Sequence, residues 1–244
     1  MDKIQFFCLN YNNDERKINM KMRFAQLDIE CTFMPGVDFT DNRISNYHEI
    51  LDNGTKRVWS CMYGHLDMIH MFYCNTNKEY GIFCEDDIFI HKNIKNYLPR
   101  ICFDFNALNL DVLLLGYLLQ DRVSNLPPNF QKEFPIKFLN DNKSPFIYHS
   151  FPEYLWGAQM YMLSRKHAKF LLDKYMKGYS ELTIQNKDIV PFSADWTLTK
   201  DGNRALISPI LVVEDNSSSY DDIGQKSFHK QCFDSHYEDD LFVV

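Results

Sequence analysis

Three consecutive carboxylates, Glu85, Asp86 and Asp87, interrupt an otherwise apolar stretch of the chain. Residues 80–84 before them and residues 88–90 after them have the composition of buried strands. Two carboxylates about 4 Å apart repel each other by roughly 4 kcal/mol at an effective dielectric constant near 20, and something must offset that repulsion. A divalent cation that prefers oxygen ligands, Mn²⁺ or Mg²⁺, is the natural candidate.

The place of this acidic triplet in a sheet also favours a ligand site. If the apolar run before it is a central strand, the triplet lies at the carboxyl end of that strand, where open α/β sheets bind ligands. In extended backbone, Glu85 and Asp87 point to one side and Asp86 to the other. The alternative is a surface turn whose acids are solvated or paired with Lys92 and Lys95, and composition alone leaves both interpretations open.

Cys61, His65, His70 and Cys74 suggest a second candidate metal site, of the zinc type. Each cysteine lies four residues from a histidine, a spacing at which two helical side chains can share a ligand. Cys61 and His70 are separated by about 900° around a helix, so the two pairs face opposite sides. We therefore favour core cysteines and a partly exposed histidine over a four-ligand site.

Other common catalytic motifs do not occur in the sequence. There is no GxSxG nucleophile elbow, no P-loop and no GxGxxG, and nine glycines leave little room for a glycine-rich phosphate loop. Phosphate binding would therefore need a metal and basic side chains, for which Arg16, Arg57 and Lys226 are candidates.

Composition narrows the class of protein. With 244 residues, 45% of them hydrophobic, the chain can form a core for one or at most two domains. Its net charge of −7 argues against nucleic acid as a partner. Seven scattered cysteines without a CxxC pair indicate a reducing compartment and no disulfide framework. Because neither a signal peptide nor a transmembrane run is evident, we expect a soluble cytoplasmic protein, of undetermined oligomeric state.

Strands and helices alternate along much of the chain. Strands are predicted at residues 3–9, 31–34, 80–84, 111–116, 158–163 and 205–213. Helices are predicted at residues 15–27, 57–75, 94–108 and 165–176, with a short one starting at 195–198. The runs at 80–84 and 111–116 are almost entirely apolar, as in central parallel strands covered on both faces. The alternation predicts an α/β fold with a mixed, mostly parallel sheet.

Two regions depart from this alternation. Residues 118–154 contain five prolines and little periodicity, and are too long for a simple connector, so we predict a binding loop or a lid. The tail from Glu214 is polar and acidic, and we expect it either to wrap the surface or to be mobile. The sequence has no internal repeat and no clear domain boundary.

Several short segments match, in order, the motifs of one enzyme family. They are Leu9-Asn10 with Asp14-Glu15-Arg16 ("NL…R…R"), 33–38 ("a.dg"), 61–65 ("gc..sH"), 83–87 ("(L/I)EDD"), 157–172 ("g..ayliSr..A..ll"), Asp195 ("pvD"), and Ser208-Pro209 with 217–223 ("P…q…S.i"). This set resembles glycosyltransferase family 25, the lipooligosaccharide and procollagen galactosyltransferases, over roughly residues 3–223. The sequence departs from the family at Gly64, where serine is frequent, in residues 118–154 and in the tail.

The resemblance implies a fold and a reaction. The fold is a single domain of the GT-A type over residues 1–244, with a nucleotide-sugar half (1–117), an acceptor half (118–213) and a C-terminal tail (214–244). The reaction is inverting transfer of galactose or glucose from a UDP-hexose to a hydroxyl of a glycan or of a collagen-like glycoprotein, usually with Mn²⁺. The alternatives are a non-catalytic sugar- or nucleotide-binding relative, an accessory subunit, or a metal-dependent phosphoesterase.

The resemblance also implies roles for the acidic triplet. Asp87 is expected to bind the metal most directly, with Glu85 or Asp86 assisting through water or ribose hydroxyls. His229 is a candidate for a late ligand that completes the metal shell from the tail.

Three further residues are expected to bind the donor. Asn10 and Arg16 follow the first strand and would hold uridine or phosphate, and His65 would contact donor or acceptor. The alternative for Arg16 is an ordinary arginine on a helix surface.

An inverting transfer needs a base beside the acceptor hydroxyl. Asp195 is the first candidate, and its alternative role is to cap a helix that starts at Trp196. Glu153 is the second candidate, because the neighbouring Tyr154 and Trp156 could stack on a sugar, although Trp156 could equally be a core residue.

Overall fold

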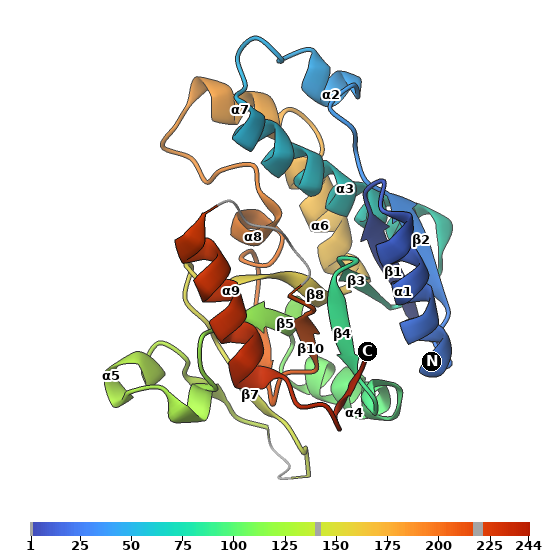
Figure 1. Cartoon of the computed structure of the whole chain (residues 1–244), viewed down its shortest axis with the longest axis vertical. Helices are drawn as coiled ribbons and strands as arrows, with labels where there is room; N and C mark the ends of the chain where they lie inside the picture. The colour runs from blue at the N-terminus through green and yellow to red at the C-terminus, as the bar shows by residue number, and fades with distance from the viewer. Residues whose placement is uncertain (1, 140–142, 217–221) are drawn as a thin grey trace.

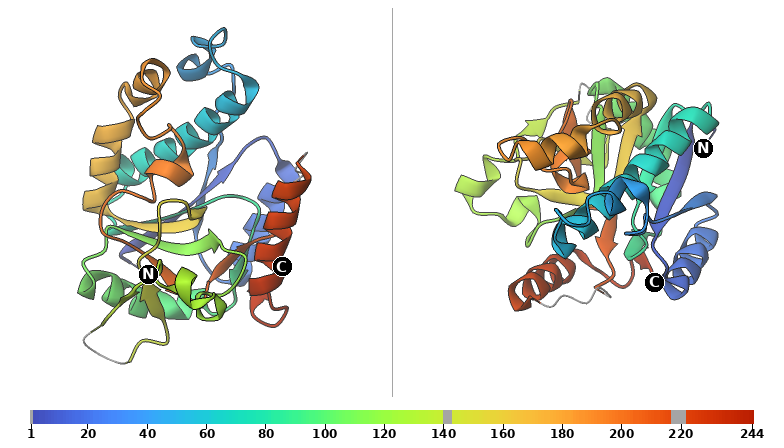
Figure 2. Two further views of the ribbon diagram at one scale, coloured as in Figure 1. Left: turned by 90° about the vertical axis from the view of Figure 1, so that its left-hand side faces the viewer. Right: turned by 90° about the horizontal axis from the view of Figure 1, so that it is seen from above.

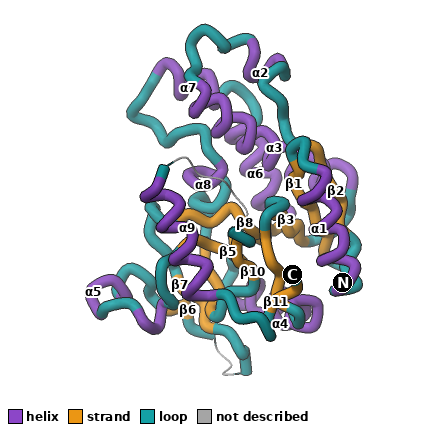
Figure 3. Tube along the Cα trace, viewed as in Figure 1, coloured by secondary structure: helices purple, strands orange, loops and turns teal. Residues whose placement is uncertain are grey.

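The computed structural model describes residues 2–139, 143–216 and 222–244 (Figures 1 and 3). Its strands are β1 (Ile4–Asn10), β2 (Cys31–Pro35), β3 (Tyr80–Cys84), β4 (Ile88–His91), β5 (Val112–Leu118), β6 (Ile136–Lys137), β7 (Ile147–His149), β8 (Trp156–Ser164), β9 (Arg204–Ser208), β10 (Val212–Glu214) and β11 (Phe242–Val243). Its helices are α1 (Asp14–Gln26), α2 (Asn42–Ser45), α3 (Asn53–Asn75), α4 (Ile94–Ala107), η1 (Val123–Asn125), α5 (Pro128–Gln131), α6 (Arg165–Tyr175), α7 (Tyr179–Gln185), α8 (Ala194–Thr197) and α9 (Ile223–His236). Apart from the run 205–213, the predicted helices and strands are present, with boundaries that differ by a few residues. The last family-like segment falls partly on 217–221, outside the described residues.

In the described part of the chain, all strands belong to one mixed sheet with the order β11-β4-β10-β5-β8-β3-β1-β2, and β9, β7 and β6 branch from β5. β1 pairs in parallel with β2 and β3, and β5 pairs in parallel with β9 and β10. β8 is antiparallel to both β3 and β5, so those two parallel groups run in the same direction. Their carboxyl ends therefore meet at one edge of the sheet. The predicted fold class, a single α/β domain with a mixed, mostly parallel sheet, is confirmed.

Alternate side chains of the central strands pack into two separate hydrophobic cores, one on each face of the sheet. Phe7 and Phe83 face α3 and α6, and their rings stack with centroids 5.6 Å apart. Phe6 and Ile82 face α1 and α4. The right-hand view of Figure 2 shows α1 and α3 on opposite sides of β1. Burying a side chain of this size contributes about 1.5–3 kcal/mol, so both faces of the sheet hold the site's framework rigid.

Three regions differ from the sequence prediction. The run 205–213 is divided into β9 and β10, with a cis peptide bond between Ser208 and Pro209. Within 118–154, short elements form, and β7 adds to the sheet beside β9, so this segment is partly framework instead of only a loop or a lid. The tail contains α9 and the edge strand β11, which pairs with β4.

The regularity of the tail was not evident from its sequence for a physical reason. α9 buries only His229, Cys232 and His236, so it lacks the apolar stripe by which amphipathic helices are identified. Its N-cap is Asp222, whose side chain accepts a hydrogen bond from the backbone N–H of Gln225 at 2.7 Å. None of the helices in the described part of the chain combines the length and apolar character of a membrane span.

Candidate functional site

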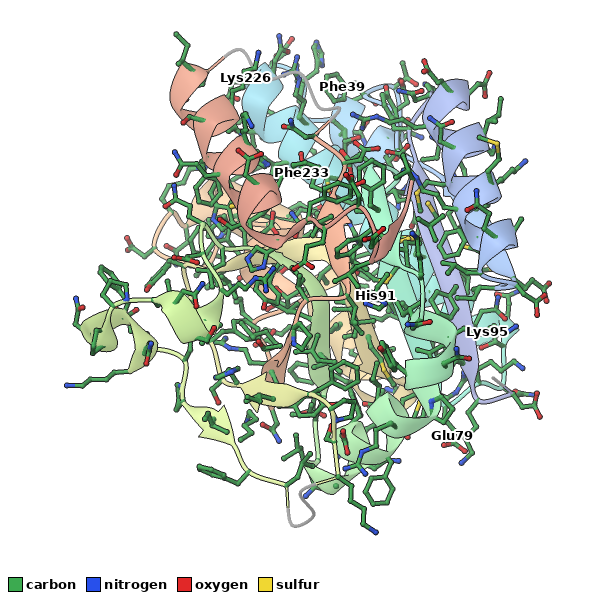
Figure 4. The ribbon with its side chains drawn as sticks, turned by 60° about the horizontal axis from the view of Figure 1, so that its bottom comes forward. Phe39, Glu79, His91, Lys95, Lys226 and Phe233 are labelled. Carbon is green, nitrogen blue, oxygen red and sulfur yellow. The ribbon has the colours of Figure 1, made fainter. Side chains whose placement is uncertain are left out.

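A cleft of about 510 Å³ opens at the carboxyl edge of β1, β2 and β3. Its walls come from the ends of these strands, from α1, from α3 and from the acidic triplet: Leu9, Tyr11, Arg16, Gly36, Val37, Phe39, Arg57, Ser60, Cys61, Glu85, Asp86 and Asp87. In Figure 4, Phe39 of this cleft lies at one end of the molecule and Glu79, which precedes β3, lies toward the other. The triplet therefore lies at a ligand-accessible edge, as predicted from its position after a central strand.

On one side of the cleft, two acids of the triplet contact α1. The guanidinium of Arg16 lies 3.1 Å from a carboxylate oxygen of Asp87 and 3.4 Å from one of Asp86. Arg16 is brought there by the start of α1, where the side chain of Asn13 caps the helix by accepting from the backbone N–H of Arg16 at 3.0 Å. Asn10, the last residue of β1, donates from its amide to Asp86 at 2.5 Å.

These contacts decide between the alternatives for the triplet and for Arg16. The acids pair with Arg16, whereas Lys92 contacts the backbone of Asp239 and Lys95 contacts Asp28. The surface-turn alternative is therefore wrong, and Arg16 is not merely a helix-surface arginine. The Asn10 amide holds Asp86 in place, and its contact with uridine or phosphate stays a prediction.

Glu85 turns to the opposite side of the cleft, toward α3. One of its carboxylate oxygens lies 3.9 Å from Sγ of Cys61 and 3.6 Å from Nε2 of His65. The other nitrogen of His65, Nδ1, lies 2.9 Å from the hydroxyl of Tyr161 on β8. The expectation that Glu85 and Asp87 share one side is wrong, because the chain leaves extended conformation after Cys84 and bends at residues 86 and 87.

Glu85 can contact Cys61 and His65 because α3 packs closely against the sheet. Asp52 caps α3 by accepting from the backbone N–H of Thr55 at 2.7 Å. Gly64 faces Leu9 of β1, and a Cβ at this position would come within 2.8 Å of the Leu9 side chain. Gly64 therefore lets the helix lie against β1, which brings Cys61 and His65 to Glu85.

Burial shifts the pKa values of Glu85 and His65, the two titratable side chains that meet on the α3 side of the cleft. Burial, followed by the charges of Asp195, Glu214 and Asp86, raises the pKa of Glu85 to about 8. Burial lowers the pKa of His65 to about 4. At neutral pH both side chains are therefore mainly uncharged. His65 is completely buried, and its contact with the donor or the acceptor stays a prediction.

Asp195 reaches the same edge of the sheet from α8. One carboxylate oxygen accepts hydrogen bonds from the backbone N–H groups of Gly157 and Ala158, each at 3.1 Å, at the start of β8. The N-cap of α8 is Ser193, so the capping alternative for Asp195 is wrong. Because β8 runs antiparallel to β3, its first residues lie at the carboxyl edge, and the charge of Asp195 acts on Glu85 there.

The other candidate residues are placed less centrally. His229 is buried, and its Nδ1 lies 2.7 Å from the carboxylate of Glu214. Asp87, Glu85 and His229 do not form a compact ligand group among the described residues, so a shared metal remains a prediction. Glu153 has a side chain that is 73% exposed and pairs with Arg204 at 2.7 Å. It does not line the cleft, and neither does Asp195, the first candidate for the base.

One buried acid near the site was missed. Glu214 ends β10 and is buried, and its charge contributes to the raised pKa of Glu85. The backbone N–H of the next residue, Asp215, donates to the carbonyl of Asp87 at 2.6 Å. An acid that follows a buried strand was the signal that singled out the triplet, and the same signal at the end of the 205–213 run would have found Glu214.

Comparison with known proteins defines the class, a glycosyltransferase. The family described as "Glycosyltransferase family 25 (LPS biosynthesis protein)" matches residues 3–185. The chain therefore belongs to glycosyltransferase family 25, and the predicted resemblance is confirmed. No curated protein matches the chain.

Solved structures resemble the chain only distantly. S. aureus TarS 1–349 is 15% identical, with a TM-score of 0.38, and the match covers 85% of this chain and 58% of TarS. A glycosyltransferase involved in glycosylation of the major capsid of PBCV-1 is 8% identical, with a TM-score of 0.41 and coverage of 94% and 98%. Mannose-1-phosphate geranyltransferase from Thermus thermophilus is 9% identical, with a TM-score of 0.45 and coverage of 84% and 73%.

Proposed function

We propose that this family 25 chain transfers a hexose, galactose or glucose, from a UDP-sugar to a hydroxyl group of a glycan or glycoprotein, with inversion at the anomeric carbon. The observation that carries the proposal is the contact of Arg16 with Asp86 and Asp87 at the open cleft. A cation and two carboxylates side by side offer complementary partners for a diphosphate and for the metal ion that accompanies it.

The donor set of this side fits a hard divalent cation. Asp87 and Asp86 present carboxylate oxygens, the ligands that Mn²⁺ and Mg²⁺ prefer. We therefore assign the cation to Asp87 in the first place, with Asp86 beside it. When bound, the cation would supply Lewis-acid stabilisation of the leaving diphosphate. Glu85, turned toward α3, and His229, engaged with Glu214, are secondary candidates.

Two arginines are the proposed partners of the diphosphate. Arg16 lines the cleft from the first turn of α1, and Arg57 lines it from α3. Within the described residues no ion pair of Arg57 is found, and its exposed side chain is available to a phosphate oxygen in the cleft. Lys226, the third basic candidate, is exposed on α9 (Figure 4) and does not line the cleft.

Asp195 is the proposed general base. The acceptor oxygen would attack the anomeric carbon while the bond to UDP breaks, and the acceptor proton would pass to the free carboxylate oxygen of Asp195. The two backbone N–H groups at Gly157 and Ala158 hold the other oxygen, so the orientation of the carboxylate is set by β8.

The acceptor side is proposed to be a second, aromatic cleft of about 340 Å³ beside the start of β8. Tyr154, Trp156 and Phe228 line it, with rings of Trp156 and Phe228 in edge-to-face contact at 6.0 Å. Trp156 precedes the Gly157 N–H that binds Asp195, so a sugar against these rings would lie near the proposed base.

A screen of nucleotide sugars tests this function. Hydrolysis or transfer by the wild-type chain is measured for UDP-galactose, UDP-glucose and other nucleotide sugars, with and without Mn²⁺. We expect UDP-hexose turnover that requires the cation and that falls by about 100-fold or more in Asp87→Asn, because a charge-stabilising group is lost.

The matched control is Glu79→Gln, an exposed acid that pairs with Lys3 at the other end of β3 and should leave turnover unchanged. Metal-independent turnover that survives in Asp87→Asn would contradict the metal assignment. Binding of UDP in calorimetry, without turnover of any nucleotide sugar, would instead indicate a non-catalytic binding protein.

A further inference from the structure

Cys61, His65 and Glu85 bring three different kinds of metal ligand together behind the cleft. Their sulfur, nitrogen and oxygen atoms all lie within 4.8 Å of one another, and the described residues contain no other group of three such side chains. Cys61 and His65 lie one turn apart on α3, and Glu85 comes from the end of β3. The sequence had suggested this cysteine–histidine pair, but not the carboxylate that faces it.

The two separations from Glu85 are close to those of a tetrahedral zinc site, and the ligand atoms of Cys61 and His65 lie within 4.8 Å of each other. Glu85 Oε1 lies 3.6 Å from His65 Nε2 and 3.9 Å from Cys61 Sγ. With bonds of about 2.3 Å to sulfur and about 2.0–2.2 Å to nitrogen and oxygen, neighbouring ligand atoms in a tetrahedron lie roughly 3.3–3.6 Å apart. Small movements of side chains would therefore bring all three into bonding distance.

His65 is oriented as a metal ligand before any metal arrives. The Tyr161 hydroxyl holds Nδ1 at 2.9 Å, which is the outer contact that metal-binding histidines usually make. Nε2 points toward Glu85, is fully buried, and has no hydrogen-bond partner among the described groups. A buried ring nitrogen without a partner is costly, and a metal ion would satisfy it.

We propose that Cys61, His65 and Glu85 form a binding site for a soft divalent cation of the Zn²⁺ type, separate from the oxygen-only site assigned to Asp86 and Asp87. On binding, the thiol of Cys61 and the carboxyl of Glu85 release their protons to solvent, and the metal gains sulfur, nitrogen and oxygen ligands. Cys61 and Glu85 both line the cleft, so the fourth position of the metal faces solvent or a ligand. This site does not depend on the proposed sugar transfer.

Cobalt spectroscopy tests the proposal directly. The metal-free full chain is titrated with Co²⁺, and we expect a near-ultraviolet band for thiolate-to-cobalt charge transfer, with visible bands of tetrahedral intensity. Added Zn²⁺ should remove these bands. Neither observation requires turnover of a sugar nucleotide, so failure of this proposal and failure of the proposed function are separate results.

The chain carries a matched control on the same helix. Cys74 and His70 have the same spacing, with Sγ and Nε2 3.4 Å apart, but this pair is exposed and is not part of a three-ligand group. We expect Cys61→Ser to lose the charge-transfer band and Cys74→Ser to keep it. The opposite pattern, or no band in the wild-type chain, would overturn the proposal.

Two further variants keep the test decisive if Cys61→Ser does not fold. Glu85→Gln should weaken Co²⁺ binding by at least about 100-fold, and Tyr161→Phe by about 10–100-fold, as expected for an outer contact. Asp173→Asn, which alters an exposed acid paired with Lys169 on α6, should leave the cobalt spectrum unchanged. Folded Glu85→Gln protein that binds Co²⁺ as tightly as wild type would contradict the proposed ligand set.

Discussion

The two sides of the acidic triplet are one residue apart in sequence and differ in chemistry. Asp86 and Asp87 face Arg16 at the open cleft, where burial raises the pKa of Asp86 and the contacts with Asn10 and Arg16 oppose that rise. Glu85 faces Cys61 and His65 of α3, where burial and neighbouring acids raise its pKa to about 8. Partners and burial, and not residue type alone, therefore set the pKa of a carboxylate in this triplet.

The largest expected effect on sugar transfer comes from a change at Asp195, whose charge contributes to the raised pKa of Glu85. Asp195→Asn keeps the oxygen that accepts from Gly157 and Ala158, so we expect the fold and UDP binding to be retained. Loss of the base should lower transfer by about 10²–10⁴-fold. Transfer is measured by release of UDP in the presence of acceptor, and UDP binding by calorimetry.

The control for this change is Asp173→Asn, which alters an exposed acid paired with Lys169 on α6. It should leave transfer and UDP binding as they are. If Asp195→Asn instead abolishes UDP binding, Asp195 belongs to the donor side of the triplet and the division drawn between the two sides is wrong.

The raised pKa of Glu85 should make the stability of the fold depend on pH. The pKa of Glu85 is about 8 in the folded chain, so between its unfolded value near 4.5 and pH 8 the folded chain holds a proton that the unfolded chain has lost. Stability therefore falls as the pH rises through this range. The pKa of His65 is lowered to about 4, so between about pH 4 and pH 6.5 this histidine makes the stability rise with pH and opposes the effect of Glu85. Above about pH 6.5 only the effect of Glu85 remains of the two.

We expect the free energy of unfolding to fall by on the order of 1 kcal/mol between about pH 6.5 and pH 8, with allowance for solvent screening of a carboxyl near the cleft. Glu85→Gln should remove this part of the fall. The free energy of unfolding of wild type and of Glu85→Gln is measured by urea unfolding in metal-free buffer at several pH values. An identical pH dependence in wild type and Glu85→Gln would show that Glu85 does not hold this extra proton in the folded chain.

The smallest predicted effect is a change in Mn²⁺ affinity on the side of the triplet where Arg16 contacts Asp86 and Asp87. Arg16→Gln removes the cation that competes with a metal ion for Asp86 and Asp87. The affinity for Mn²⁺ without nucleotide should rise several-fold, up to about 10-fold, since each 1.4 kcal/mol of relieved competition is a factor of ten. Calorimetry with Mn²⁺ measures the change.

Arg43→Gln serves as the matched control, because Arg43 bridges Asp41 and Asp67, two acids that do not line the cleft. It should not alter Mn²⁺ affinity at the triplet. Weaker Mn²⁺ binding in Arg16→Gln would mean that Arg16 orients the carboxylates for the metal instead of competing with it.

Much of the framework followed from local signals in the sequence. The apolar runs at 80–84 and 111–116 became buried strands, and the helical spacing of Met62, Leu66 and Ile69 became the core face of α3. Such patterns are readable because they repeat with the period of one element. The antiparallel insertion of β8 between β3 and β5 was not readable, since the sequence of a buried strand does not state its direction.

The sequence by itself determined that three acids leave a central strand at the ligand edge, and its ordered motifs determined the family. Only the tertiary structure decided which acid has which partner. Arg16, Cys61 and Asp195 come from α1, α3 and α8, segments far apart in the chain, and they meet the triplet only after strands and helices have packed. Because a carboxylate's charge depends on burial and on such distant neighbours, the chemistry of Glu85 could not be derived from its position in a run of acids.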